Sequence, residues 1–247
     1  MDNQHVIHSA ALRSCGEQCG KASIDGVTAP TSWVGAILDL VLPVACVGCG
    51  ASRSAFCAGC VQACARPLTM RVPLPVVAYG WYAGVLRTAL IRYKERGQRD
   101  LAEPLAQLLE TALVRAFERA PPAGIVLVPV PSARSVARQR GGNHVLRLAK
   151  KAGRALDLPV HALLSLQWAV RDSAGLGAAQ RGMNLAGAMA ARHCPGGGRP
   201  SAVIVDDIVT TGTTVREAAR ALTEAGWHVS GAAVVAATPR GDPKCPQ

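Results

Sequence analysis

The pattern of hydrophobic and polar positions along the chain predicts alternating strands and helices. Three short, continuous apolar runs are typical of strands buried on both faces, and they cover 125–128, 203–205 and 232–236. Apolar residues at helical spacing predict helices over 84–93, 101–119, 143–155 and 215–225. This alternation indicates an α/β fold with a parallel sheet and helices on both of its faces. Ligands of such folds bind at the carboxyl ends of the strands.

The N-terminal part of the chain lacks this alternation. Residues 1–32 mix small, polar and charged residues without apolar periodicity, so we expect a disordered tail there. A short apolar helix is predicted from Trp33 to about Leu42, because Pro43 would stop it. The helix leads into a cysteine-rich stretch, and together these segments predict a small module over 33–66.

A second boundary is indicated by prolines. Pro67, Pro73 and Pro75 are typical of a linker between the small module and the next apolar segment. We therefore expect the main domain to span 76–240 and a short tail to follow at 241–247.

Composition limits the class of protein. The chain has 247 residues, of which 49% are hydrophobic, enough for one buried domain with a smaller module attached. The longest apolar stretch, 34–47, is interrupted by Asp39 and Pro43 and is shorter than the roughly 20 residues that cross a bilayer. The N-terminus also lacks the basic region and apolar core of a secretory signal. We expect a cytoplasmic protein without membrane insertion.

The charge of the chain favours anionic partners. Lys and Arg number 27 against 16 Asp and Glu, which gives a formal net charge of +11. The basic residues are concentrated in 87–99 and 134–154, where they would suit phosphates, nucleotides or nucleic acid. A solvated basic surface is the alternative for each patch. Because only 4% of residues are aromatic, stacking platforms for single-stranded nucleic acid are scarce.

The segment 203–214, VIVDDIVTTGTT, carries the candidate chemistry. Asp206 and Asp207 follow the predicted strand 203–205. Adjacent carboxylates repel each other and are costly to bury, so we expect both to face a ligand or solvent at the end of the strand.

A loop of small residues follows the two acids. Its glycine lets the backbone approach an anion, and its hydroxyls add donors. Thr214 and Glu217 have the spacing of a capping box, so a helix should begin at the loop and favour a phosphate at its N-terminus. A phosphate on the loop and hydroxyls on the acids describe a ribose phosphate; a Thr/Gly-rich turn beside exposed acids is the alternative. The predicted phosphate-binding residues are Thr210, Thr211, Gly212, Thr213 and Thr214.

The cysteine-rich stretch has the spacing C-x₂-C-x₇-C-x₂-C. Four thiolates at this spacing suit a tetrahedral, closed and structural Zn²⁺ site. An iron–sulfur cluster and free or oxidised thiols are the alternatives. The predicted ligands are Cys46, Cys49, Cys57 and Cys60.

The segment VIVDDIVTTGTT resembles the signature of the type I phosphoribosyltransferases. The resemblance implies that Asp206 and Asp207 hold the ribose hydroxyls of phosphoribosyl diphosphate and act in catalysis, that the Thr loop holds the 5-phosphate, and that Mg²⁺ accompanies the diphosphate. Purine-salvage members carry an acid where this chain has Thr210, which argues against a hypoxanthine or guanine enzyme.

Two further segments are predicted to complete the ligand pocket. The stretch ending in Ser132 resembles the loop that meets the diphosphate, with Arg134 and Arg140 as sources of charge; a proline-stiffened turn with surface arginines is the alternative. The Gly/Ala-rich stretch 171–184 has the composition of a mobile lid or of a plain connector. Within it, Arg171 and Arg181 are candidate phosphate contacts.

The order of the motifs along the chain, from LVLP and the cysteine pairs through YAGVLRTALIRYKERG, VPVP and RQRGGN to VIVDDIVTTGTT, resembles the ComF family. The resemblance implies an N-terminal zinc finger, a phosphoribosyltransferase-like domain, and a link to natural competence and DNA uptake, with a helicase and single-stranded DNA as partners. The chain departs from the family where an aromatic residue becomes Gly142, where a Gln becomes His144, and at Ser173.

Two functions follow from these predictions. One is a transferase with an unspecified acceptor, in which the acid pair orients the ribose and stabilises positive charge on it. No residue of the sequence stands out as its general base. The other is a non-catalytic nucleotide or phosphoribosyl sensor that contacts DNA or a helicase.

Overall fold

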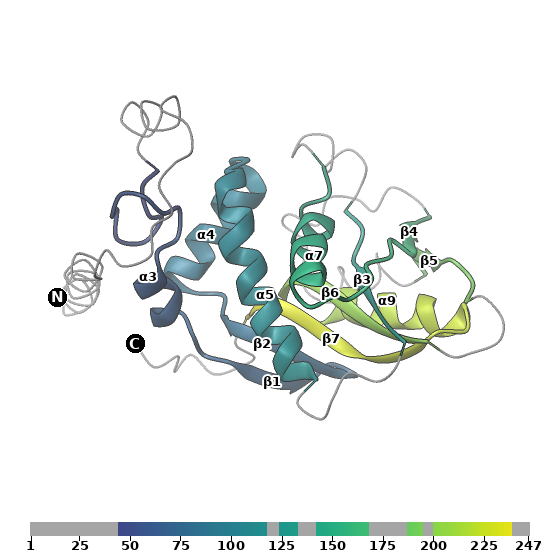
Figure 1. The fold of residues 1–247 in the computed structure, drawn as a ribbon. Coiled ribbons are helices and arrows are strands. Elements are labelled where there is room, and N and C mark those ends of the chain that lie inside the picture. The colour runs from purple at the N-terminus through teal and green to yellow at the C-terminus, as the bar shows by residue number, and fades with distance from the viewer. Residues whose placement is uncertain (1–43, 118–123, 133–141, 168–186, 195–199, 239–247) are drawn as a thin grey trace.

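The computed structural model describes residues 44–117, 124–132, 142–167, 187–194 and 200–238. Its centre is a five-stranded sheet in the order β1-β2-β7-β6-β3 (Figure 1). The strands are β1 (Leu68–Arg71), β2 (Pro75–Trp81), β3 (Ile125–Pro129), β6 (Ser201–Val209) and β7 (His228–Ala237). All neighbouring pairs are parallel except β1 and β2, which are antiparallel. The predicted α/β class with a largely parallel sheet is confirmed.

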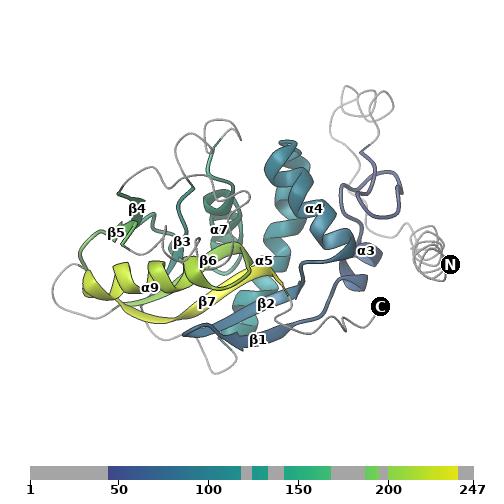
Figure 2. The same ribbon diagram turned by 180° about the vertical axis from the view of Figure 1, so that it is seen from behind.

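Helices cover both faces of this sheet (Figures 1 and 2). The helices are α4 (Gly84–Glu95), α5 (Ala102–Ala116), which follows the 3-10 turn η1 (Arg99–Leu101), α7 (His144–Ala155) and α9 (Thr213–Glu224). In β6, Val203 and Val205 belong to the core under α4, α5 and α7, whereas Ile204 belongs to the core under α9. Alternate residues of one strand thus serve opposite faces, which explains the continuous apolar run. Within the described ranges, no helix combines the length and apolar character needed to cross a membrane.

A second, small sheet lies against α9. It consists of β4 (Leu164–Leu166) and β5 (Met189–Ala191), which pair antiparallel. The carboxylate of Glu217 on α9 accepts a hydrogen bond from the Met189 amide at 2.9 Å, and Arg220 donates to the Met189 carbonyl at 2.8 Å. These contacts fasten the small sheet to α9. The predicted lid residues Arg171 and Arg181 belong to the connection between β4 and β5 and lie outside the described residues.

The start of α9 corrects the predicted capping box. Gly212 is the N-cap residue and has a left-handed φ of 78°, and no side chain in the described part of the chain caps the helix. Glu217 is buried and bonds to Met189 and Arg220 instead of turning back to the N-terminus. The spacing of Thr214 and Glu217 was compatible with a cap, but a tertiary partner competes for the carboxylate.

The cysteine-rich segment packs on the main sheet. It contains the short helix α3 (Ala58–Ala63), and the hydroxyl of Tyr79 on β2 donates to the Val61 carbonyl at 3.1 Å. Phe56 is buried in the same core as Leu86 of α4. The segment therefore shares the core of the sheet. The helix predicted from Trp33 and the two predicted tails lie outside the described residues.

The stretch 67–75, predicted as a linker, contains strand β1. Its prolines lie where a strand tolerates them, because Pro67 precedes β1, Pro73 lies in the turn between strands, and Pro75 is the first residue of β2. The prolines therefore mark the ends of an edge hairpin, and the linker prediction is wrong for residues 68–71.

A substitution at Gly80 tests the contact between the cysteine-rich segment and β2. A Cβ at this position would lie 2.4 Å from the carbonyl oxygen of Cys64, a backbone atom that cannot rotate away. We expect Gly80→Ala to lower the free energy of unfolding by about 1–3 kcal/mol, as overpacking does in other cores. Gly231→Ala is the graded control, because its Cβ would lie 3.0 Å from the Pro75 carbonyl oxygen. Equal losses in urea unfolding would contradict this account.

Candidate functional site

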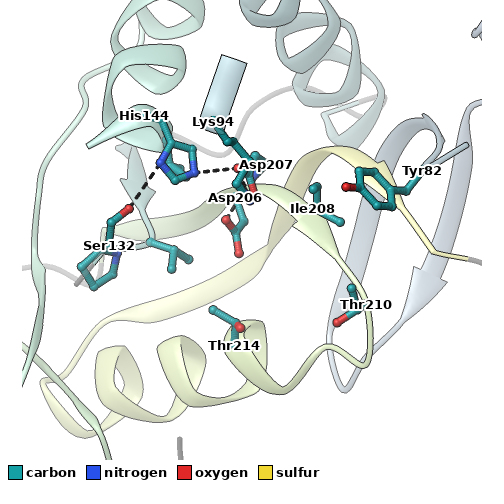
Figure 3. A pocket seen from close by; sticks show the side chains of 12 residues that line it. Tyr82, Lys94, Ser132, His144, Asp206, Asp207, Ile208, Thr210 and Thr214 are labelled. Atoms are coloured by element: carbon teal, nitrogen blue, oxygen red, sulfur yellow. Dashed lines mark hydrogen bonds and ion pairs between the residues drawn. The ribbon is translucent and has the colours of Figure 1, made fainter. Parts of the chain in front are cut away.

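A cavity of about 360 Å³ opens at the carboxyl ends of β3 and β6 (Figure 3). Elements distant in the sequence meet there, namely the end of β2, helix α4, the loop after β3, the start of α7 and the β6–α9 loop. The polar side chains of its lining are those of Tyr82, Lys94, Ser132, His144, Asp206, Asp207, Thr210 and Thr214. The position agrees with the rule that open α/β sheets bind ligands beyond the carboxyl ends of their strands.

The acid pair lies inside β6 and not after it. The strand continues to Val209, and Asp206 is in register with Val234 of β7. On the other side β3 pairs with β6 only as far as Val205. One edge of β6 is therefore free of β3 at the two acids, and the cavity opens there. The predicted strand was too short because the acids were taken to end it.

The two acids were predicted to face a ligand or solvent, and both line the cavity, but neither is exposed. Asp206 is 8% exposed and Asp207 is 3% exposed. Successive residues of a strand point to opposite faces, and Figure 3 shows Asp207 directed toward α4 and α7 and Asp206 toward α9. Each acid consequently has its own electrostatic surroundings.

Asp207 is held by two basic side chains. Its Oδ2 lies 3.0 Å from Nζ of Lys94 and 2.7 Å from Nε2 of His144 (Figure 3). Burial alone would raise the pKa of Asp207, but the positive charge of Lys94 and the hydrogen bond from His144 outweigh burial. The pKa of Asp207 is therefore held well below its usual range, and the group is a carboxylate.

His144 has further partners besides Asp207, one at its ring and one at its backbone. Its Nδ1 lies 3.5 Å from Oγ of Ser132, and its backbone carbonyl accepts a hydrogen bond of 3.1 Å from the Tyr93 hydroxyl. The sequence did not lead us to predict Lys94 and His144 as site residues. Lys94 lay within the predicted basic patch 87–99, and His144 was noted only as a departure from the ComF pattern.

Asp206 has the opposite pKa shift. Burial and the neighbouring charge of Asp207 both disfavour a second carboxylate, and they raise the pKa of Asp206 to about 8. Lys94 opposes this shift without reversing it. The protein without a ligand therefore carries a protonated Asp206 beside an ionised Asp207 at neutral pH.

This assignment predicts the pH dependence of stability. A carboxyl group whose pKa is raised by folding stabilises the folded state at low pH, and that contribution is lost as pH rises from about 4 to about 8. We expect the unfolding midpoint of the wild type to fall over this window relative to that of Asp206→Asn, which cannot ionise. Thermal unfolding across the pH range measures the difference. Parallel curves for the two proteins would contradict a raised pKa.

The predicted phosphate loop reaches the cavity at its two ends. Thr210 and Thr214 line it, and the hydroxyls of Thr211 and Thr213 lie 2.9 Å apart within the turn. The left-handed backbone of Gly212 turns the chain into α9. The predicted diphosphate contact Ser132 also lines the cavity, while Arg134 and Arg140 lie outside the described residues.

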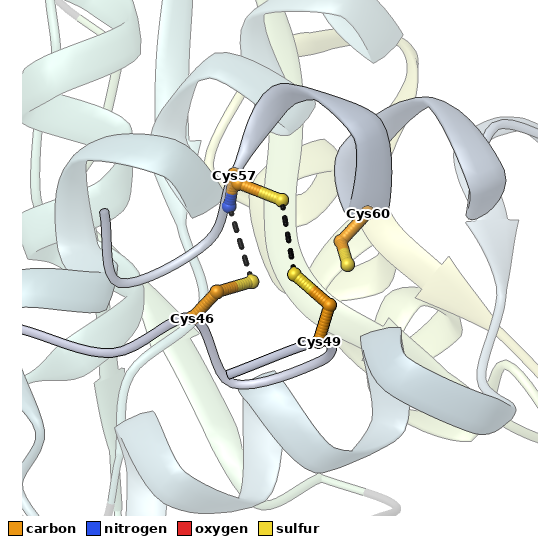
Figure 4. A group of neighbouring side chains, drawn as sticks. All are labelled: Cys46, Cys49, Cys57 and Cys60. Atoms are coloured by element: carbon orange, nitrogen blue, oxygen red, sulfur yellow. Dashed lines mark hydrogen bonds between the residues drawn. The ribbon is translucent and has the colours of Figure 1, made fainter. Parts of the chain in front are cut away.

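The four cysteines of the predicted metal site converge at one point (Figure 4). Their sulfur atoms all lie within 4.8 Å of one another, and the sulfurs of Cys49 and Cys57 are 3.6 Å apart. A tetrahedral Zn²⁺ with Zn–S bonds of about 2.3 Å needs sulfur separations of roughly 3.8 Å, so the cluster fits such an ion. The four-cysteine cluster can hold a metal such as zinc.

The backbone around the cluster favours a thiolate. Burial would raise the pKa of Cys46, but hydrogen bonds from the backbone at Cys57, Cys49 and Gly48 outweigh burial and lower this pKa to about 7. The amide of Cys57 lies 3.3 Å from the Cys46 sulfur. Thiolates are the form that coordinates metal, so the amides prepare the site for a cation.

Comparison with known proteins relates the C-terminal part of the chain to one domain family. The profile of the "Phosphoribosyl transferase domain" matches residues 200–244. Orotate phosphoribosyltransferase from Aeropyrum pernix has 15% sequence identity and a TM-score of 0.35, with 69% of this chain and 73% of that chain covered. For adenine phosphoribosyltransferase from Leishmania donovani the identity is 11% and the TM-score 0.33, with 64% and 75% covered. No curated protein sequence matches the chain. The unit of β6, α9 and β7 is thus similar to a phosphoribosyl transferase domain.

Proposed function

We propose that the cavity binds phosphoribosyl diphosphate. The ribose hydroxyls would bind to Asp206 and Asp207, the 5-phosphate to the loop 210–214, and the diphosphate end toward Ser132. The observation that carries this proposal is that the acid pair and the Thr loop line one cavity, within the segment that matches a phosphoribosyl transferase domain. The geometry adds Lys94 and His144 to the same wall.

The charges of the cavity support a polyanionic ligand. Two full carboxylates would repel phosphate groups, but Lys94 and His144 hold Asp207. The raised pKa of Asp206, about 8, keeps a proton on the second acid. The protein groups in contact with the ligand therefore carry less negative charge than the sequence DD suggests.

We also propose that Mg²⁺ enters with the diphosphate. Mg²⁺ prefers oxygen ligands and is commonly held by substrate phosphates and water. Oδ2 of Asp207 already contacts Lys94 and His144. The oxygens of the diphosphate are therefore the best ligands for Mg²⁺ in this cavity. When bound, the ion would neutralise part of the diphosphate charge. Arg134, Arg140, Arg171 and Arg181 stay proposed as further phosphate contacts.

The same contacts would serve a transferase. The bond from ribose C1 to the diphosphate breaks as an acceptor approaches, and positive charge develops on the ribose. Asp206 and Asp207 would orient the sugar and stabilise this charge, while the loop anchors the 5-phosphate. Ligand sensing without turnover needs only the binding part of this arrangement.

Calorimetry with phosphoribosyl diphosphate and Mg²⁺ tests the binding proposal. We expect the wild type to bind and Asp206→Asn with Asp207→Asn to bind at least tenfold more weakly, about 1.4 kcal/mol. Absence of binding by the folded wild type would refute the proposal. A panel of bases and amines then separates the two functions: diphosphate release that Asp207→Asn abolishes indicates a transferase, and binding without release indicates a sensor.

The cellular role is a further part of the proposal. The motif order resembles the ComF family, and we propose a cytoplasmic role in natural competence and DNA uptake, with a helicase and single-stranded DNA as partners. The net charge of +11 and the exposed basic residues Arg87, Arg96, Lys150 and Arg154 on α4, α7 and the turn after α4 favour contact with nucleic acid. A strand-binding assay should show steep salt dependence, and no binding at low salt would remove the DNA contact.

A further inference from the structure

We propose that His144 takes up a proton when the diphosphate end of the ligand enters the cavity, so that both of its ring nitrogens donate hydrogen bonds, one to Asp207 and one to Ser132. The inference rests on the proposed binding of phosphoribosyl diphosphate and deepens it. His144 would be a positioning residue, because it acts on the ligand through these two partners.

The ring of His144 lies between the two ends of the proposed ligand site. Nε2 faces the ribose end, 2.7 Å from Oδ2 of Asp207, and Nδ1 faces the diphosphate end, 3.5 Å from Oγ of Ser132 (Figure 3). The residue is 6% exposed. Its backbone is held at the first turn of α7, where Asn143 caps the helix and Tyr93 donates to the His144 carbonyl.

The hydrogen bonds of a neutral ring have only one consistent direction. An ionised Asp207 can only accept, so Nε2 must carry the hydrogen. Nδ1 of the neutral ring then has only a lone pair, and the Ser132 hydroxyl has to donate to it. The Ser132 oxygen would present lone pairs to the cavity. Because phosphate oxygens are acceptors as well, this arrangement opposes a diphosphate.

A second proton on the ring reverses the direction at Ser132. Nδ1–H then donates to the Ser132 oxygen, and the hydroxyl hydrogen is released to donate to a diphosphate oxygen. Nε2–H continues to donate to Asp207. The site also gains one positive charge as a polyanion arrives, and charge-assisted hydrogen bonds are the stronger kind. The ribose end alone provides neither effect, so ribose 5-phosphate should not require the proton.

The charged groups around the ring act in both directions. Asp207 on β6 favours an imidazolium, and Lys94 on α4 opposes it. Asp206 lies next to Asp207, and Arg147 of α7 reaches the Tyr93 hydroxyl at 3.5 Å. The diphosphate is the partner whose arrival changes this balance. The free protein and its complex with ribose 5-phosphate are therefore the proper references.

Calorimetry in two buffers with different ionisation enthalpies counts the protons taken up on binding. The probes are phosphoribosyl diphosphate with Mg²⁺ and ribose 5-phosphate. The key variant is His144→Gln, because the amide nitrogen of Gln can still donate to Asp207 but cannot take up a proton. Protonation of the diphosphate itself is common to both proteins and cancels in the comparison.

We expect the wild type to take up more protons than His144→Gln with phosphoribosyl diphosphate, and both proteins to behave alike with ribose 5-phosphate. Because the wild-type complex would hold one more proton than the free protein, the affinity of the wild type relative to the variant should fall as pH rises. The limit for one proton is about tenfold per pH unit. A purely structural role of His144 would weaken both ligands without changing the proton count.

Ser132→Ala provides a second variant should His144→Gln fail to fold. It lies on a partly exposed loop and removes the hydroxyl that has to turn. We expect it to lose the extra proton uptake as well. Wild-type proton uptake in either folded variant would overturn the inference while leaving the proposed function intact. Failure of the wild type to bind phosphoribosyl diphosphate would instead refute the proposed function.

Discussion

Replacement of Cys60 by Ser is expected to remove most of the free energy of unfolding. Cys60 is 1% exposed and belongs to the same core as Leu86 and Leu90 of α4. Structural zinc sites in small peptides contribute apparent binding free energies of about 10–16 kcal/mol, whereas a whole domain is stable by only about 5–15 kcal/mol. Loss of one ligand would therefore leave a protein near the unfolding threshold. Urea unfolding together with the zinc content of the purified protein measures this effect.

Cys64→Ser is the matched control for the metal site. Cys64 directly follows α3, as Cys60 lies within it, but it is not among the four cysteines whose sulfurs converge. We expect it to retain bound zinc and to lose about 1 kcal/mol or less. A strong chelator should reproduce the Cys60→Ser result in the wild type. Equal unfolding midpoints for the two variants, or a chelator without effect, would argue against a structural metal.

The second large effect is expected at Lys94. In Lys94→Met the buried carboxylate of Asp207 loses a partner at 3.0 Å and keeps the contact with His144 at 2.7 Å. Removal of one partner from a buried ion pair typically costs about 3–5 kcal/mol, because the remaining charge is poorly compensated. The side chain of Lys94 is 22% exposed, so the lower end of that range is expected. Affinity for phosphoribosyl diphosphate should fall as well, since the cavity loses a positive charge.

Lys151→Met is the control for this substitution, since it is the same chemical change in an exposed ion pair. Lys151 pairs with Glu103, and the two side chains are 39% and 62% exposed. Exposed pairs contribute about 0–1 kcal/mol, so little stability should be lost. Unfolding by urea and calorimetric titration of both variants give the comparison. If Lys94→Met were no more destabilising than Lys151→Met, the ion pair with Asp207 would not be a structural contact.

Helix α4 connects the two sites addressed by these substitutions. At its start, Val85 packs next to Gly48, which lies between the first two cysteines of the cluster. A Cβ added at Gly48 would lie 2.7 Å from both Val85 and the Cys60 sulfur. Near its end, Lys94 reaches Asp207. The four-cysteine cluster and the cavity are therefore attached to opposite ends of one helix.

Local sequence was sufficient for the elements that carry their own signal. The apolar runs predicted β3, β6 and β7 because both faces of those strands are covered. The helix predicted from residue 143 is α7, and the Asn143 side chain caps it by accepting a hydrogen bond from the Leu146 amide. The spacing of the cysteines indicated four ligands that the fold brings within 4.8 Å. In each case the residues that form the feature are neighbours or lie on one short stretch.

Structural prediction failed where a local sequence pattern was compatible with two different structures. Glu217 had the spacing of a capping residue but bonds to Met189 and Arg220, which the small sheet brings beside α9. The prolines of 67–75 indicated a linker, yet they flank an edge strand. The local sequence pattern allowed both structures in each case, and the tertiary packing determined which of them formed.

The segment 203–214 already contained the acid pair, the Thr loop and the start of a helix, because these features follow one another along the chain. The chemistry of the acids depended on the tertiary structure. Lys94 and His144 are separated from Asp207 by more than sixty residues, and only the packing of α4 and α7 on the same face of the sheet brings them to one carboxylate oxygen. These contacts, together with burial, explain why the pKa values of two neighbouring, chemically identical side chains are shifted in opposite directions.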